Sequence, residues 1–68
     1  MQNSTRKARD RVINNIEQLR IEMEHEKQFA TFLRGHGDDT LSLEENIASI
    51  EQLIEINERT VERLEKLL

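Results

Sequence analysis

Apolar residues in the second half of the chain recur at alternating steps of four and three. The series contains Asn57, and its other seven members are apolar: Leu43, Ile47, Ile50, Ile54, Val61, Leu64 and Leu68. A 3.5-residue period of this kind is typical of a helix that packs against another helix in a left-handed supercoil. The pattern therefore predicts a helix over residues 43–68.

The first half of the chain repeats the same stepping. Its series is Arg9, Val12, Ile16, Leu19, Met23, Glu26, Ala30 and Leu33, of which six are apolar. This stripe predicts a second long helix, over residues 4–34.

A single cluster of turn-forming residues, "RGHGDDT" at residues 34–40, separates the two stripes. Gly35 suits the left-handed position that follows the end of a helix. Ser42, with Glu45 three residues later, is typical of a capping box at the start of the next helix. These signals predict a loop over residues 35–42, and a short connection between long helices predicts an antiparallel hairpin.

Folding the chain at this loop brings the two stripes together without gaps. The expected layers include Leu33 with Leu43, Ala30 with Ile47, Glu26 with Ile50, Met23 with Ile54, Leu19 with Asn57, and Ile16 with Val61. The predicted fold is therefore all-α: one helical-hairpin domain spanning residues 1–68.

A single hairpin leaves several large apolar residues outside its stripes. A chain of 68 residues without cysteine has neither a large core nor a disulfide to stabilise it, so we expect association into a four-helix bundle, with a homodimer as the simplest form. The predicted oligomer interface consists of Val12, Ile16, Leu19, Met23, Ile47, Ile50, Leu53, Ile54, Asn57, Val61, Leu64 and Leu67. Ile21, Phe29 and Phe32 are the predicted docking surface for another protein.

Three stripe positions, Arg9, Glu26 and Asn57, are not apolar. Asn57 is interpreted as a device that fixes register and partner number, because alternative pairings would leave its amide without a hydrogen bond. In a dimer, two Asn57 side chains would meet, or each would bond a nearby backbone group or glutamate. The alternative is a bundle that opens to water at Asn57. The longer side chain of Glu26 is expected to reach water.

Charge is distributed unevenly along the chain. The net charge is −4, and the segment "RKARDR" at residues 6–11 holds four basic residues and one acid. In the antiparallel layering this segment lies beside Glu62 and Glu65, which favours ion pairs within the hairpin. The alternatives are binding of an acidic protein partner and a nucleic-acid surface made of Arg6, Lys7, Arg9 and Arg11. No aromatic residue lies nearby to stack on bases, so nucleic acid is not the expected partner.

The sequence offers little catalytic or metal-binding chemistry. His25 lies among Glu22, Glu24 and Glu26, but the second helix has no histidine to complete a metal site. No serine or threonine has a base and an orienting group nearby in sequence, and no glycine-rich phosphate loop is present. We therefore expect no enzyme activity, no cofactor and no metal.

Two segments resemble known families. Residues 8–20, "ARDRVINNIEQLR", resemble the basic region and first helix of basic helix-loop-helix DNA-binding proteins through Arg9, Arg11, Ile13 and Asn14, although the base-reading glutamate is absent. This resemblance implies DNA binding by a dimeric four-helix bundle.

Residues 16–23, "IEQLRIEM", are similar to the first helix of the small sporulation aspartyl-phosphate phosphatases. That resemblance implies a helical hairpin that acts on a response-regulator phosphoprotein. The family's Ser-Gln-Glu-Leu-Asp motif is not retained, because Ile47 and Glu51 occupy the positions of its serine and its aspartate.

No uncharged apolar run exceeds two residues, so neither a membrane span nor a secretory signal is expected, and the predicted location is the cytoplasm. The sequence as a whole predicts a small, non-catalytic protein–protein interaction or regulatory module that forms homo-oligomers and binds an unidentified protein.

Overall fold

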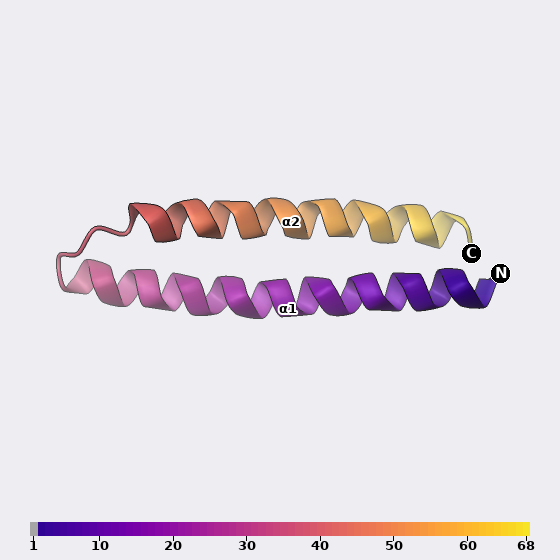
Figure 1. Ribbon diagram of the computed structural model, residues 1–68, viewed down its shortest axis with the longest axis horizontal. Helices are drawn as coiled ribbons and strands as arrows, with labels where there is room; N and C mark the ends of the chain where they lie inside the picture. Colours follow the sequence, from indigo (N-terminus) through magenta and orange to yellow (C-terminus); the bar gives the residue numbers. More distant parts are fainter. Residues whose placement is uncertain (1) are drawn as a thin grey trace.

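The computed structural model describes residues 2–68 as two long helices packed side by side. Helix α1 spans Gln2–Gly35 and α2 spans Leu41–Lys66. The hairpin is a thin rod with extents of 54 × 14 × 11 Å, and the start of α1 and the end of α2 lie at the end opposite the loop (Figure 1). The antiparallel hairpin predicted from the two apolar stripes is confirmed.

The C-terminal end of helix α1 differs from the prediction. Gly35 is the last residue of the helix, and Gly37 is the glycine with a positive φ, of 76°. The N–H of Asp38 donates to the carbonyl of Leu33, and the N–H of Gly37 donates to that of Arg34, both at 3.0 Å. This pair of bonds is a Schellman motif with Gly37 at the left-handed position. The assignment of that position to Gly35 was wrong. The helix includes Gly35, and the left-handed residue follows two positions later, at Gly37.

Helix α2 begins two residues before the predicted start. Thr40 occupies the N-cap position and is buried, with 8% of its surface exposed. The Asp39 carboxylate accepts a hydrogen bond from the N–H of Leu41 at 2.9 Å, and so satisfies one of the free donors of the first turn. Ser42 lies inside the helix, and the predicted Ser42–Glu45 capping box is wrong.

The interface between the helices follows the two predicted stripes. Ile16, Ala30 and Ile54 are buried, and the other stripe members from Val12 to Leu33 and from Leu43 to Leu64 are half-buried. Their neighbours in sequence are largely exposed, so the seam between the helices is one stripe wide on each side. This narrow seam is the whole core of the described hairpin.

The polar seam residues Asn57 and Glu26 are accommodated differently. Asn57 Nδ2 donates to the carbonyl of Leu53, one turn earlier in the same helix, at 2.7 Å. One N–H of the amide is thus paired within α2. Glu26 is half-buried, and its Oε2 atom is enclosed without a hydrogen-bond partner among the described residues. The expectation that Glu26 reaches water does not hold for this oxygen.

Three ion pairs between the helices agree with the predicted register. They are Arg20–Glu58 at 3.7 Å, Lys27–Glu51 at 3.9 Å and Arg34–Glu44 at 2.7 Å. Each pair immediately follows one of the predicted layers in sequence, namely Leu19 with Asn57, Glu26 with Ile50 and Leu33 with Leu43. The pairs recur every seven residues, as expected for two helices that stay in step along a supercoil.

Candidate interaction surfaces

The hairpin has two flanks with opposite character on either side of the seam. We call the flank that carries the three interhelical ion pairs the charged flank. Its members are Arg20, Lys27, Arg34, Glu44, Glu51 and Glu58. All six lie one residue after a seam position, so they project from the same side of the hairpin.

The other flank carries large apolar side chains. We call it the apolar flank, and its members are Phe29, Phe32, Leu53, Ile56 and Leu67, with exposed fractions between 47% and 69%. Successive residues of an α-helix are turned by about 100°, which places the charged flank roughly 70° to one side of the seam and the apolar flank roughly 90–130° to the other. The ion pairs and these five exposed apolar side chains thus lie on opposite faces of the rod, while exposed Ile13 and Leu41 lie outside the apolar flank.

The predicted docking surface is divided by this arrangement. Phe29 and Phe32 lie together on the apolar flank, and the Phe32 ring also packs against the ring of His36, with centroids 4.4 Å apart. Ile21 is 50% exposed but points to the back of α1, roughly 170° from the seam. Ile21 therefore does not share a surface with the two phenylalanines.

The predicted oligomer interface is also divided. Its ten seam members, including Asn57, face the other helix of the same hairpin, whereas Leu53 and Leu67 are exposed on the apolar flank. Phe29, Phe32 and Ile56 join Leu53 and Leu67 there. Contacts of any of these residues with a second copy stay a prediction.

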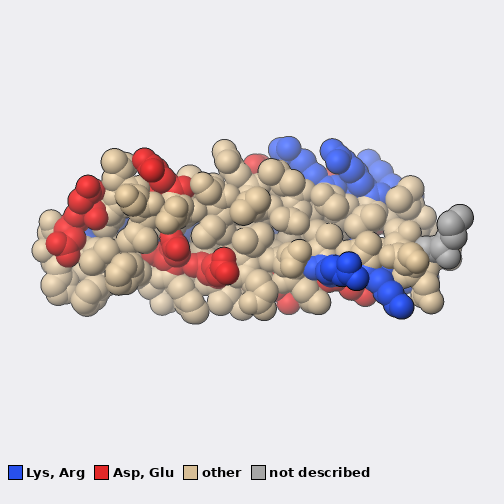
Figure 2. All heavy atoms as spheres, in the orientation of Figure 1, with Lys and Arg blue, Asp and Glu red and all other residues tan. Residues whose placement is uncertain are grey.

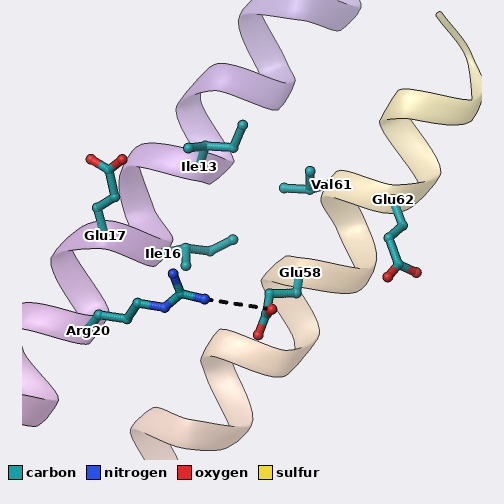
Figure 3. A pocket seen from close by; sticks show the side chains of 7 residues that line it. All are labelled: Ile13, Ile16, Glu17, Arg20, Glu58, Val61 and Glu62. Atoms are coloured by element: carbon teal, nitrogen blue, oxygen red, sulfur yellow. Dashed lines mark ion pairs between the residues drawn. The ribbon is translucent and has the colours of Figure 1, made fainter.

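A shallow groove of about 330 Å³ lies on the charged flank near the chain termini (Figure 3). Ile13, Ile16 and Val61 form its apolar floor, and the Arg20–Glu58 ion pair lies across one end. Glu17 and Glu62 also line the groove, and Figure 3 shows their carboxylates pointing outward on either side. Ile13 lies seven residues before Arg20. The seven-residue spacing of the basic side chains on the charged flank would place another one at this position, and Ile13 occupies it instead.

The basic N-terminal segment does not pair as predicted. Arg9 bonds to its neighbour Asp10 at 3.2 Å, and within residues 2–68 no ion pair joins the segment to Glu62 or Glu65. Arg6, Lys7 and Arg11 are exposed.

Helix α2 adds further basic side chains at the same end of the rod. They are Arg59, Arg63 and Lys66, and all three are exposed. Their position near the N-terminal segment was not predicted from the sequence, because the two groups are about 50 residues apart along the chain and come to the same end of the rod only when the chain folds back on itself.

Residues singled out for chemistry lie apart from one another. His25 is exposed on α1, and no group of three or more His, Cys, Asp or Glu side chains in the described part of the chain is arranged to hold a metal ion. Ile47 is half-buried in the seam, and Glu51 is engaged with Lys27. Neither helix, over residues 2–68, carries an apolar stretch long enough to cross a membrane.

Comparison with known protein families, curated proteins and solved structures finds no match to this chain. The proposed function therefore rests on the residues of this chain.

Proposed function

We propose that this protein is a non-catalytic interaction module that associates with a second copy of itself through the apolar flank to form a four-helix bundle. The observation that carries the proposal is the division of the rod into a flank of interhelical ion pairs and a flank of half-exposed apolar side chains. A solitary hairpin would leave the second flank in water along its whole length.

The size of the flank suits a dimer. The rod measures 54 Å by 14 Å in the plane of the two helices, so the projected area of each broad face, 54 × 14, is about 750 Å². Stable interfaces bury about 800 Å² on each partner. Covering the apolar flank also widens the buried stripe of each helix from the narrow seam to the width that bundle helices typically bury.

A different protein could compete for the same flank. Phe29 and Phe32 cannot contact a second copy and another protein at the same time, so binding of another protein through them requires the dimer to open. Self-association is the interaction that the geometry favours, because the apolar side chains extend from Phe32 near the loop to Leu67 near the termini.

Sedimentation equilibrium of matched variants tests the proposal. The unaltered chain should have twice its monomer mass of 8.1 kDa, and the double variant Leu53→Glu, Ile56→Glu should have the monomer mass. Glutamate is a good helix former, so helical propensity is retained. Ile21→Glu is the matched control, because Ile21 is equally exposed but lies on the back of α1, and it should remain dimeric. A monomeric unaltered chain, or a dimeric double variant, would overturn the proposal.

A second candidate function is nucleic-acid binding by the basic end of the rod. The observation in its favour is that exposed basic side chains of α1 and α2 gather at the same end. Binding driven by phosphate contacts weakens steeply as salt rises. Titration of a labelled duplex at roughly 50 mM and 200 mM salt would test it, since absence of binding at the lower concentration removes this candidate.

A further inference from the structure

We propose that the two hairpins of the dimer lie antiparallel, with the loop end of each beside the chain termini of the other. This inference rests on the self-association proposed above, and it specifies the occupant of the apolar flank as an inverted second copy. Two features of the flank carry it: the charges along its rim and the axial positions of its apolar side chains.

The charge on the rim changes sign along the rod. Toward the termini the exposed side chains beside the apolar flank are basic, with Arg11 on α1 and Arg63 on α2. At the loop end they are acidic, with Asp38 and Asp39 both exposed. Figure 2 shows this division on one broad face, where acidic side chains gather toward the loop and basic ones toward the termini.

The charge division discriminates between the two arrangements of a symmetric dimer. If both loops lay at the same end, acidic rim would face acidic rim and basic rim would face basic rim. Inverting one copy places the acidic loop end of each hairpin beside the basic terminal end of the other. Complementary potentials of this kind favour one orientation and penalise the other, because like charges brought together at an interface are destabilising.

The apolar side chains have the spacing that an inverted copy requires. With a helical rise of about 1.5 Å per residue, the Phe29–Phe32 pair lies about 15 Å from Ile56 toward the loop, and Leu67 lies about 15 Å from Ile56 toward the termini. A twofold axis across the rod at Ile56 would therefore set Ile56 beside its symmetry mate. It would also bring the phenylalanine pair of one copy to the level of Leu67 in the other.

Single-cysteine crosslinking tests the orientation, because the natural chain has no cysteine. Ser4 and Ser42 are both exposed and lie on the rim of the apolar flank, at opposite ends of the rod. They are about 45 Å apart along one hairpin, and an inverted second copy brings Ser42 to the level of the partner's Ser4. Ser4→Cys and Ser42→Cys chains, one of them isotopically heavy, would be mixed, refolded together and treated with a short bismaleimide crosslinker.

The antiparallel dimer predicts that the crosslinked product of the mixture is the Ser4→Cys–Ser42→Cys pair, and that either variant alone crosslinks poorly. Efficient crosslinking of each variant alone indicates the parallel arrangement and overturns the inference. A dimeric mass without any crosslinked product also overturns it. A monomeric mass in sedimentation contradicts the proposed function itself, so the two failures are distinguishable.

Discussion

Arg34 and Glu44 join the last turn of α1 to the first turn of α2. Arg34 Nη2 lies 2.7 Å from Glu44 Oε1, and the hydroxyl of the buried Thr40 donates to the same oxygen at 3.4 Å. Both bonds converge on one carboxylate at the loop end. This makes Arg34–Glu44 the shortest of the interhelical ion pairs in the described chain.

We expect the Arg34–Glu44 pair to contribute about 0.5–1 kcal/mol to the free energy of unfolding, the upper part of the range for exposed pairs. A double-mutant cycle with Arg34→Met and Glu44→Gln, followed by urea unfolding at one fixed protein concentration, measures this coupling. Lys27–Glu51, at 3.9 Å, is the matched control and should couple more weakly. An equal or stronger coupling for the control would contradict the expectation.

The two glycines should respond in opposite ways to alanine. Gly37 has a positive φ, and an L-residue in that region costs roughly 1–2 kcal/mol, so Gly37→Ala should lower the free energy of unfolding by about that amount. Gly35 is helical, and Gly35→Ala should raise it by up to about 1 kcal/mol. A β-carbon meets no atom within 4 Å at either site, so crowding does not confound the comparison. Thermal unfolding that shows Gly35→Ala as the damaging change would refute this assignment of the turn.

The start of α2 can be located by removing its two candidate capping side chains separately. Asp39→Ala should cost about 0.5–2 kcal/mol, because the carboxylate no longer accepts the Leu41 N–H. Ser42→Ala should cost little, because Ser42 is an exposed residue within the helix. Urea unfolding measures the free energy of unfolding of both variants. A larger decrease for Ser42→Ala than for Asp39→Ala would support the Ser42–Glu45 capping box that the sequence predicted.

Replacing Glu26 by leucine should stabilise the hairpin by roughly 1–3 kcal/mol, the range of penalties for a buried polar group without a hydrogen bond. The substitution also extends the apolar seam opposite Ile50. Glu24→Leu is the matched control at an exposed position, and it should change the free energy of unfolding by less than about 0.5 kcal/mol. If Glu26→Leu lowered the midpoint of urea unfolding, the enclosed Oε2 atom would not destabilise the hairpin as its missing hydrogen bond indicates.

Several features of the fold followed from the sequence alone. The alternation of steps of four and three predicted the two helices. Matching the stripes across the loop predicted which residues face each other, and the three interhelical ion pairs agree with that register. These predictions succeeded because each rests on many positions at once. A single polar residue such as Asn57 or Glu26 does not disturb a period carried by the other stripe members.

Only the tertiary structure decided the helix ends and the flanks. Gly35 and Gly37 both suit a left-handed turn, and Asp39 and Ser42 both suit a helix start. Local hydrogen bonds worth about 1 kcal/mol choose between such neighbours, so residue type alone does not rank them. The gathering of Arg63 and Lys66 with the N-terminal bases likewise depends on the fold, which brings together segments that are remote along the chain.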